Sequence, residues 1–255
     1  NKTALITGAT SGIGRAVADI FAENKYNLIV TGRRSERLQE LKAALEQQYG
    51  IGVLALCFDV RDNDEVVRNI ESLPVEWRNI DVLVNNAGLA VGLNHIQDGV
   101  LDDWERMIDT NIKGLLYVTR AVSPLMVARN SGHIVNICSV AGKEVYENGN
   151  VYCATKHAVD ALSKAMRIDM LGHNIKVTNI CPGAVETEFS IVRFKGDTQR
   201  AAGTYKGIEP LTGRDIAECI YFAVSLPEHV CINDMMIMPA AQADSRTFNR
   251  KEHRN

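Results

Sequence analysis

The chain of 255 residues has no long hydrophobic run and no excess of charge of one sign. A membrane span needs about 18 consecutive apolar residues, and none of that length is present. The 28 basic and 31 acidic side chains give a formal net charge of −3, which produces no field that would attract nucleic acid. We therefore expect neither a membrane nor a nucleic acid as partner.

The six cysteines contain no CxxC pair, and the six histidines show no HExxH spacing, so we expect no metal site. Cysteines in apolar stretches, such as Cys57 within Leu54–Phe58, are interpreted as free thiols of the core. The histidines are interpreted as surface or loop residues. Reduced thiols favour a cytoplasmic location. Because Asn1–Thr7 runs straight into an expected strand, we expect no signal peptide there.

The chain also lacks internal repeats, low-complexity segments and Pro/Gly-rich linkers. Short runs of Val, Ile and Leu alternate with segments of helical period, such as Glu36–Tyr49 and Asp102–Met126. This alternation predicts an α/β fold, a single-domain Rossmann-type doubly wound parallel sheet with helices on both faces. About seven strands are expected, at Thr3–Thr7, Asn27–Thr31, Val53–Phe58, Asp81–Val84, His133–Cys138, Lys176–Ile180 and Asp234–Met238.

Two regions interrupt the alternation. Residues 182–211 form a long insertion between a strand and a helix, and such insertions are usually functional lids. Residues 241–255 are polar, and we expect this tail to fray or to reach a neighbouring subunit. Residues 1–240, lid included, are then the single catalytic domain.

A glycine-rich loop follows the first expected strand and leads into a helix expected at Arg15–Asn24. Its glycines would let the backbone approach a pyrophosphate, and the helix N-terminus would supply free N–H groups. The spacing is G-x-x-x-G-x-G rather than the common G-x-G-x-x-G, so by itself the loop could equally be an ordinary strand–helix corner. Its candidate cofactor-binding residues are Gly8, Thr10, Ser11, Gly12, Ile13 and Gly14.

The ends of the next strands carry further nucleotide-binding candidates. At the second strand, where NAD enzymes place an acidic residue for the ribose, the chain has Arg33 and Arg34. Two guanidinium groups would instead neutralise the 2′-phosphate of NADP, although in isolation they would be two solvated arginines. After the third strand, the carboxylate of Asp59 could accept from the adenine amino group. The remaining candidates here are Val60, Asn86, Ala87 and Gly88, of which the last three would otherwise form a simple turn.

Ser139, Tyr152 and Lys156 form the strongest catalytic pattern. Ser139 ends the fifth strand, while Tyr152 and Lys156 stand four residues apart and share one helix face. A phenol has a pKa of about 10, and lowering it by three units needs about 4 kcal/mol. We therefore do not expect Lys156 to act alone, and a cationic nicotinamide could contribute. A Tyr-x-x-x-Lys pair alone is usually structural, but together with the glycine loop and Ser139 it favours catalysis.

These motifs resemble the short-chain dehydrogenase/reductase family over nearly the whole chain. The resemblance implies that Tyr152 is the acid/base, that Ser139 holds the substrate oxygen, and that Lys156 binds the nicotinamide ribose while lowering the pKa of Tyr152. It also implies that Asn111 anchors a water that relays the proton. Asn86 would border the adenine ribose and the segment Val185–Thr187 the nicotinamide, and Pro182, Gly183, Val185 and Thr187 are further cofactor-binding candidates.

A closer resemblance is to the branch that oxidises L-serine, L-allo-threonine and other 3-hydroxy acids with NADP. It rests on Thr31-Gly32-Arg33-Arg34-x-x-Arg37-Leu38, Leu73-Pro74-x-Glu76-Trp77, Met107–Asn111 and Glu188–Asp197. That branch also reduces malonic semialdehyde to 3-hydroxypropionate, and its members are homotetramers. Cys138 and the run Lys143–Val145 depart from its pattern beside the expected substrate pocket, which leaves the substrate open.

The sequence thus predicts a cytoplasmic NADP-dependent oxidoreductase that moves a hydride between nicotinamide and C3 of a small 3-hydroxy acid. The substrate carboxylate needs a cation, and Arg193 in the lid is the candidate, with Lys195 pointing elsewhere. Arg193 could equally pair with Glu188 or Asp197, or anchor a subunit contact. Two other functions stay open: a reductase of 3-oxoacyl thioesters or bulkier ketones, and a nucleotide-sensing module without catalysis.

Overall fold

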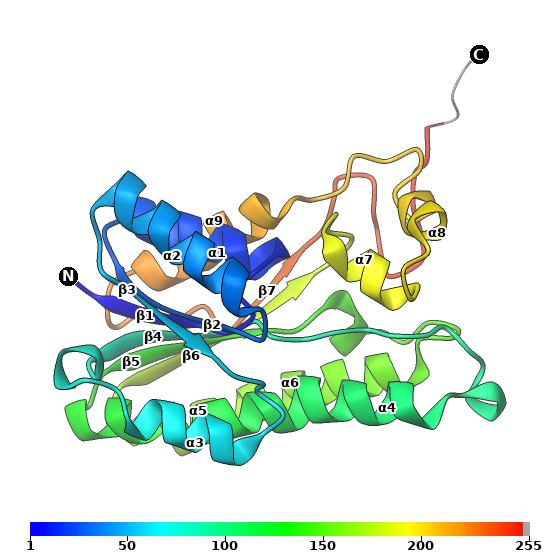
Figure 1. The fold of residues 1–255 in the computed structure, drawn as a ribbon. Coiled ribbons are helices and arrows are strands. Elements are labelled where there is room, and N and C mark those ends of the chain that lie inside the picture. The colour runs from blue at the N-terminus through cyan, green and yellow to red at the C-terminus, as the bar shows by residue number, and fades with distance from the viewer. Residues whose placement is uncertain (252–255) are drawn as a thin grey trace.

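The computed structural model describes residues 1–251, and in it seven parallel strands form one sheet in the order β3-β2-β1-β4-β5-β6-β7 (Figure 1). The expected doubly wound sheet is confirmed, and each expected strand has a counterpart. The strands are β1 (Thr3–Ile6), β2 (Asn27–Gly32), β3 (Val53–Cys57), β4 (Ile80–Asn85), β5 (Gly132–Ile137), β6 (Ile175–Pro182) and β7 (Asp234–Ile237).

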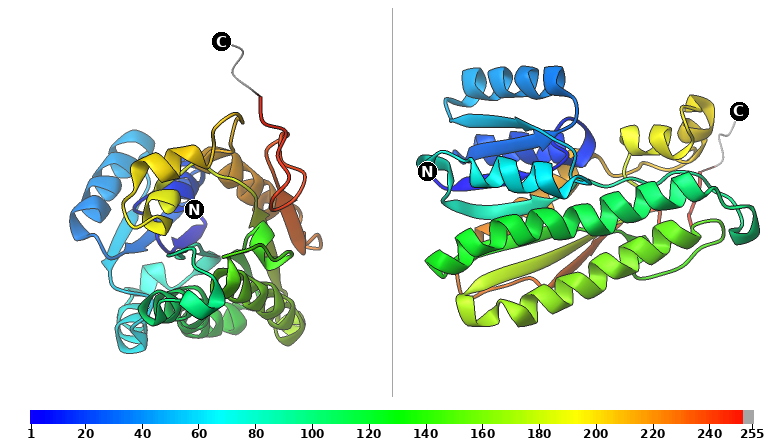
Figure 2. Two further views of the ribbon diagram at one scale, coloured as in Figure 1. Left: turned by 90° about the vertical axis from the view of Figure 1, so that its right-hand side faces the viewer. Right: turned by 60° about the horizontal axis from the view of Figure 1, so that its bottom comes forward.

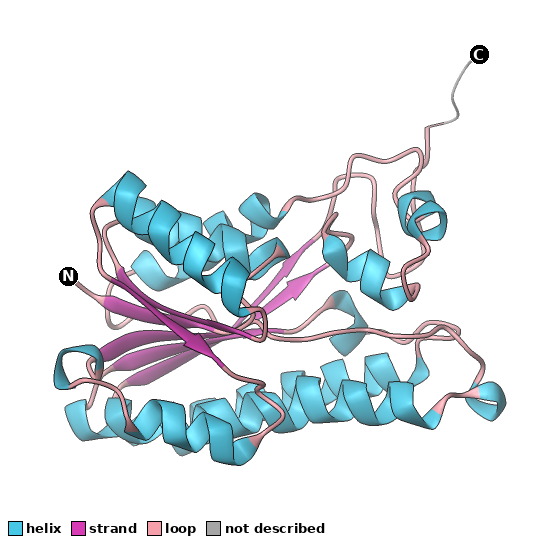
Figure 3. Ribbon diagram, viewed as in Figure 1, coloured by secondary structure: helices cyan, strands magenta, loops and turns pink. Residues whose placement is uncertain are grey.

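Helices cover both faces of the sheet (Figures 1 and 3). One face carries α1 (Gly12–Glu23), α2 (Ser35–Tyr49) and α9 (Gly213–Ser225). The other face carries α3 (Asn63–Glu71), α5 (Leu115–Arg129) and α6 (Asn150–Asp169). Apolar positions at helical spacing produce this packing: Leu38, Leu41 and Leu45 of α2 are buried against the sheet.

The topology places a cleft at the carboxyl ends of the central strands. The strand β1 pairs with β2 on one side and with β4 on the other, so the chain reverses its direction across the sheet at this point. Open α/β sheets bind their ligands at such a switch point. The helix α1 begins at Gly12, three residues before the expected start, so the end of the glycine loop already forms its first turn.

The segment expected as one helix at Asp102–Met126 is continuous but not uniform (Figure 2, right). It consists of α4 (Leu101–Ile108), a π-helical turn (Asp109–Gly114) and α5. Turns of this type occur frequently at functional sites. Single helical turns also occur at Val75–Trp77, Ile96–Asp98, Val140–Gly142 and Leu171–His173.

The expected lid and tail lie together beyond the carboxyl ends of the strands (Figure 1). The lid contains α7 (Glu188–Arg193) and α8 (Thr198–Gly203). The expectation of fraying is wrong for residues 241–251. That stretch folds back on itself, with Ala243 N donating to Thr247 O at 3.0 Å, and Lys251 N donates to Gly207 O in the lid at 2.8 Å. Residues 252–255, the end of the predicted tail, lie outside the described residues.

Two expectations about single residue types need correction. Cys57 is exposed, because β3 is an edge strand, whereas Cys138, Cys153 and Cys181 are buried as expected; all six cysteines are free. His133 is a core residue, not a surface one: its Nε2 lies 2.7 Å from Thr178 Oγ1. Burial, and then the charge of Lys176, lower the pKa of His133 to about 3, so its ring is neutral. Within residues 1–251, no helix could cross a membrane, and no cluster of His, Cys, Asp or Glu could hold a metal.

Candidate active site

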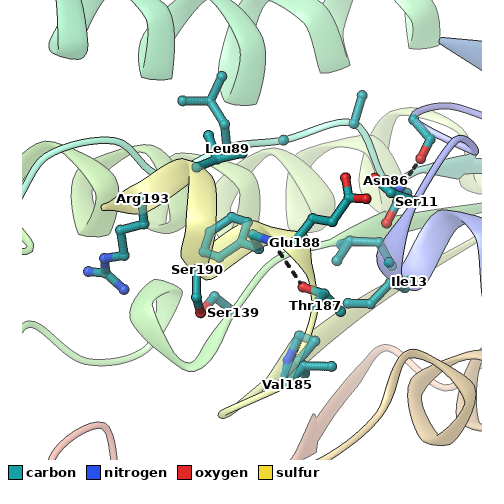
Figure 4. A pocket seen from close by; sticks show the side chains of 18 of the residues that line it. Ser11, Ile13, Asn86, Leu89, Ser139, Val185, Thr187, Glu188, Ser190 and Arg193 are labelled. Carbon is teal, nitrogen blue, oxygen red and sulfur yellow. Dashed lines mark hydrogen bonds between the residues drawn. The ribbon is translucent and has the colours of Figure 1, made fainter. Parts of the chain in front are cut away.

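A cavity of about 570 Å³ lies at the carboxyl ends of the central strands, a size typical of cofactor and substrate sites. Figure 4 shows Ser11, Ile13 and Asn86 at one end of it, Arg193 at the other, and Ser139 between them. The structure brings together nearly all the predicted site residues, and those lining the cavity are Gly8, Thr10, Ser11, Gly12, Ile13, Arg33, Arg34, Asp59, Val60, Asn86, Ala87, Gly88, Ser139, Tyr152, Lys156, Pro182, Gly183, Val185, Thr187 and Arg193. Gly14 and Asn111 lie directly behind residues that line the cavity and hold them in position.

The glycine loop has the geometry of a phosphate cradle. Gly8 and Gly12 have φ of +66° and +55°, conformations that favour glycine. A Cβ on Gly14 would lie 2.3 Å from Gly8 O, so only glycine permits this tight turn. Within the described chain, the side chain of Ser11 does not cap α1. The first N–H groups of the helix are therefore available to an anion.

Asn86 supports this loop from β4. Its Nδ2 donates to Thr7 O at 2.9 Å and to Gly8 O at 3.2 Å. The backbone N–H groups of Asn86 and Ala87 both donate to Thr7 Oγ1 at 3.0 Å. These bonds fix the end of β4 against the cradle, so that Asn86 contributes as a support as well as a wall of the cavity.

The two predicted arginines lie at the far end of the cradle, on the nucleotide side. Arg34 donates to Thr10 Oγ1 at 2.8 Å and to Ser11 Oγ at 3.0 Å. Arg33 lies 3.8 Å from Asp59, whose carboxylate is also held by Arg61 at 2.7 Å. Burial favours the protonated form of Asp59, but the hydrogen bonds of Arg61 outweigh it and lower the pKa. Asp59 thus reaches the cavity as an ionised acceptor.

A third arginine, Arg37, belongs to this cluster and was not among the predicted site residues. Arg34 and Arg37 donate to the carboxylate of Glu188 at 3.2 and 3.0 Å. Glu188 is the first residue of α7, and Thr187 before it caps that helix by accepting from Phe189 N. The start of the lid therefore forms ion pairs at the end of the cavity where Arg33 and Arg34 lie. The branch motif around Arg34 contained Arg37 and could have indicated it.

Ser139, Tyr152 and Lys156 meet in the middle of the cavity, as predicted. Ser139 follows β5, and its hydroxyl accepts from Ala141 N at 3.1 Å. Tyr152 and Lys156 lie in the first turns of α6 and are 8% and 6% exposed. The ammonium of Lys156 donates to Ile137 O at 2.9 Å and lies 5.9 Å from the centre of the Tyr152 ring.

The electrostatics of Tyr152 differ from the prediction. Burial, followed by the neighbouring Tyr146, raises the pKa of Tyr152, while the hydrogen bond of Ser139 and the charge of Arg193 lower it. The resemblance implies a lowering by Lys156, which we did not expect to act alone, and burial lowers the pKa of Lys156 itself. In the chain without cofactor the phenol of Tyr152 is therefore protonated at neutral pH.

Asn111 lies in the π-helical turn and is 2% exposed. Its Oδ1 accepts from Leu89 N at 2.9 Å, and its Nδ2 donates to Leu89 O at 2.8 Å and to Thr155 Oγ1 at 3.0 Å. The side chain thus fixes the loop after β4 against the catalytic helix α6. That Asn111 anchors a water which relays the proton stays a prediction. Because its side chain already bonds to Leu89 and Thr155, such a water would have to bind another polar group of the π-helical turn.

Arg193 points into the cavity from the end of α7. Its Nη2 donates to Tyr146 Oη at 2.6 Å, and its guanidinium lies 5.3 and 5.5 Å from the ring centres of Tyr146 and Tyr152. Among the described residues, its buried Nε has no hydrogen-bond partner. A buried guanidinium N–H without a partner indicates a missing acceptor.

The structure also bears on one of the alternatives considered for Arg193, its pairing with a carboxylate of the lid. Glu188 pairs with arginines at the nucleotide end, and Asp197 accepts from the backbone of Arg200. Neither is the partner of Arg193, so that interpretation is wrong. Lys195 points away, as predicted, and lies 2.7 Å from Asp103.

Sequence reasoning missed part of the substrate end. The ring of Phe189 lies 5.8 Å from that of Tyr152, and its i, i+4 relation to Arg193 is the signal that could have found it. Residues of loops and of the tail also line the cavity, and no local sequence pattern shows that they come close to it. Among them are Tyr146, Tyr205, Gln242, Ser245, Phe248 and Arg250.

Comparisons of the sequence with known proteins indicate the same class of enzyme as the residues of this site. Residues 2–197 match the family model described as short chain dehydrogenase. The chain is 50% identical over 240 residues to the NADP-dependent 3-hydroxy acid dehydrogenase YdfG of Salmonella typhi, covering 94% of this chain and 95% of that protein. It is 45% identical over 252 residues to the NADP-dependent 3-hydroxy acid dehydrogenase of Schizosaccharomyces pombe, covering 98% and 97%.

The solved structures give the same result. The closed form of serine dehydrogenase complexed with NADP+ matches with a TM-score of 0.91 and 45% identity, over 98% of this chain and all (100%) of that one. The serine dehydrogenase of Escherichia coli matches with a TM-score of 0.82 and 43% identity, over 94% and 99%. The predicted resemblance is therefore confirmed, and the chain belongs to the short-chain dehydrogenase family.

Proposed function

We propose that this chain is an NADP-dependent oxidoreductase that transfers a hydride between nicotinamide and C3 of a small 3-hydroxy acid. The substrates we expect are of the L-serine, L-allo-threonine and 3-hydroxypropionate/malonic semialdehyde type. The observation that carries the proposal is the guanidinium of Arg193, which lies 5.5 Å from the ring centre of the expected acid/base, Tyr152. A cation at this distance suits a substrate that carries a carboxylate close to its reacting hydroxyl.

The cavity fits NADP on grounds of its own chemistry. The cradle that a Cβ on Gly14 would fill, and the open N-terminus of α1, suit a pyrophosphate. Arg33 and Arg34 at its far end suit a 2′-phosphate. Lys156 is the donor we assign to the nicotinamide ribose. When bound, NADP+ supplies the acceptor for the hydride that leaves C3.

The residues of the chain would handle the proton. The Ser139 hydroxyl donates to the substrate oxygen and holds it beside Tyr152. During oxidation Tyr152 takes the hydroxyl proton, and during reduction it returns that proton to the carbonyl oxygen. Lys156 and the oxidised nicotinamide are positive charges that favour the phenolate during oxidation. Asn111 would hold the loop after β4 against α6, the helix that carries Tyr152.

Arg193 would bind the carboxylate of the substrate. Its Nη2 is already oriented by Tyr146, and the neighbouring Nε–H has no partner among the described residues. A carboxylate can accept two parallel hydrogen bonds from that edge of the guanidinium. Such a clamp would also orient C3 toward the nicotinamide, because the acid is too short to rotate freely between its two anchors.

The test replaces Arg193 and compares a 3-hydroxy acid with its methyl ester. A charge-assisted hydrogen bond contributes about 1.5–3 kcal/mol, so Arg193→Ala should lower kcat/KM for the acid by one to two orders of magnitude. The ester should lose much less. Arg193→Lys should also impair oxidation of the acid, because an ammonium cannot make the two parallel bonds. Equal losses for acid and ester would contradict the clamp.

The matched control is Arg200→Ala. Arg200 is a lid arginine that stacks on Phe194 at 5.0 Å, and it does not line the cavity. Its removal changes the charge of the lid by the same amount as Arg193→Ala. If Arg200→Ala reduced kcat/KM for the acid as strongly, general attraction of the anion and not a clamp would explain the result.

We further propose that the chain assembles as a homotetramer and works in the cytoplasm. Large apolar side chains remain exposed on α9 and the edge strand β7, where Phe222 and Met236 are 55% and 47% exposed. Ile168 and Leu171, at the end of α6, are more exposed still. Exposed apolar surface of this kind is typical of association between subunits. The cytoplasmic location rests on the free cysteines.

A further inference from the structure

Two thiols lie next to each other directly below the catalytic serine. Cys138 follows the last residue of β5, and Cys181 lies in β6. The register pairs Ile137 with Ile180, and Cys138 N donates to Ile180 O at 2.7 Å, which makes Cys138 and Cys181 the next opposed pair. Neighbouring strands are about 4.8 Å apart, and a disulfide spans Cα separations of about 4.4–6.8 Å.

The two side chains point to the same face of the sheet. Both belong to the core below α6, and they are 3% and 0% exposed. The strand register therefore places the two thiols side by side. Cys138 also lines the cofactor cavity, while Cys181 is completely buried beside it. A small molecule in the cavity would therefore meet Cys138 first.

The surroundings make the two thiols chemically unequal. The hydrogen bond from Cys181 lowers the pKa of Cys138, and the charge of Lys156 adds to this effect against the opposing effect of burial. The contact with Cys138, burial and the nearby Asp234 raise the pKa of Cys181. The thiol of Cys181 donates a hydrogen bond to Asp234 Oδ1 at 3.4 Å. Cys138 thus has the character of a nucleophile, and Cys181 is the thiol whose place in the register lets it resolve an oxidised Cys138.

We propose that Cys138 and Cys181 are a redox modification site, at which a peroxide entering the cofactor cavity converts the pair to a disulfide and stops catalysis. The Cys138 thiolate attacks one peroxide oxygen and the O–O bond breaks; the leaving hydroxide takes up the proton that the Cys138 thiol had released, so a sulfenic acid and one water result. The sulfur of Cys181 then attacks the sulfur of Cys138 and the S–O bond breaks; the proton of Cys181 goes to the leaving oxygen, which departs as a second water. Two thiols lose two electrons in total, and one peroxide is reduced to two waters.

The disulfide would disturb the catalytic centre because both cysteines adjoin it. Cys138 precedes Ser139, and its sulfur lies 3.2 Å from Lys156 O. Closing the bond would draw that sulfur away from α6 and move Ser139 with it. A displacement of about 1 Å can cost on the order of 10² in rate. This consequence rests on the proposed role of Ser139.

The experiment treats the chain with hydrogen peroxide and follows thiols, disulfide and turnover in parallel. Two thiols should be lost together, a peptide pair joining Cys138 and Cys181 should appear under non-reducing conditions, and turnover should fall on the order of 10²-fold. Dithiothreitol should restore both thiols and turnover. NADP+ should slow the reaction, because Cys138 lines the cavity that it would occupy. The peptide pair is detected independently of activity, so its absence would overturn the site even if the dehydrogenase function stands.

Two variants complete the test. In Cys181→Ala, or in Cys181→Ser should the first fold poorly, Cys138 has no resolving partner, so excess peroxide should oxidise its sulfenic acid further to the sulfinic acid, which inactivates the chain and which dithiothreitol does not reduce. Recovery equal to that of the unchanged chain would overturn the proposal. Cys57→Ser is the matched control, because Cys57 is exposed and distant in register from the pair. Loss of the peroxide response in Cys57→Ser would equally overturn the proposal.

Discussion

At the scale of single residues, the chemistry centres on a phenol held among apolar and cationic groups. Burial keeps Tyr152 protonated in the chain without cofactor, and Ser139 and Arg193 oppose that effect. The protonated phenol is the form needed to reduce a carbonyl group. Oxidation requires the phenolate, which needs the additional positive charge of an oxidised nicotinamide. In the proposed mechanism, the protonation state of Tyr152 is therefore coupled to the redox state of the cofactor.

This account predicts that Tyr152→Phe separates binding from turnover. Only the hydroxyl is removed, so NADPH should still bind with nearly unchanged affinity. Turnover should fall by about 10²–10⁴, the usual contribution of general acid–base catalysis. Steady-state kinetics together with the fluorescence of bound NADPH would measure both effects. A Tyr152→Phe variant with near-normal turnover would remove Tyr152 from the mechanism.

At the scale of elements, Lys143 connects three parts of the structure around the catalytic serine. It follows the turn Val140–Gly142 and forms ion pairs with Asp160 of α6 and Asp234 of β7. Burial disfavours its charge, but the hydrogen bonds to both carboxylates outweigh this and raise the pKa of Lys143. The same bond, with one from Lys164, overcomes burial and lowers the pKa of Asp160.

Lys143→Met should therefore destabilise the fold in a pH-dependent way, by about 1–3 kcal/mol at neutral pH. The folded pKa of Asp160 is lowered, so its contribution is present above the ordinary value of 3.8 and is lost as the pH falls through the folded pKa. The folded pKa of Lys143 is raised, so its contribution is present below 10.5 and is lost as the pH rises through the folded pKa. Urea unfolding at several pH values would show whether the loss of stability in Lys143→Met is confined to the pH range between these two limits.

The control for this prediction is Lys164→Met. Lys164 also pairs with Asp160, at 2.7 Å, but its side chain is 60% exposed and the pair is an i, i+4 contact on the helix surface. Such pairs contribute about 0.3–0.5 kcal/mol. If the two variants lost the same stability, the network around Lys143 would be no more than a surface ion pair.

The elements also show what a sequence can predict. The strands and the helix face of Leu38, Leu41 and Leu45 follow from local periodicity, and the structure confirms them. The cleft residues follow from the rule that ligands bind at the carboxyl ends of the strands. The contact of Arg34 with Glu188 joins residues 154 positions apart, and no local pattern encodes it.

At the scale of the whole molecule, the lid and residues 241–251 lie over the site as a folded layer. Gln242 is buried, and its Oε1 accepts from Ala184 N at 2.8 Å. The tail was expected to be loose because it is polar, but backbone hydrogen bonds to the lid and to loops hold it. Polar composition alone did not reveal these long-range bonds.

The proposed tetramer can be tested at the same scale. Light scattering should give the mass of four chains for the unchanged protein. Phe222→Asp places a charge on the exposed apolar surface of α9 and should produce smaller species, because the charge would have to be desolvated in the interface. An unchanged protein that is monomeric at micromolar concentration would contradict the proposed assembly.

The specificity of the unchanged chain for substrate and for cofactor tests most directly whether it is an NADP-dependent dehydrogenase of short 3-hydroxy acids. We would measure kcat/KM for 3-hydroxypropionate, L-serine and L-allo-threonine with NADP+ and with NAD+, and for 3-oxoacyl thioesters and bulky ketones with NADPH. The account predicts that a short 3-hydroxy acid with NADP+ gives the highest value, and that NAD+ lowers it by at least about tenfold, since a charge-assisted bond to the 2′-phosphate is lost. Faster turnover of a thioester or a bulky ketone than of every short acid, or equal use of NAD+, would contradict it.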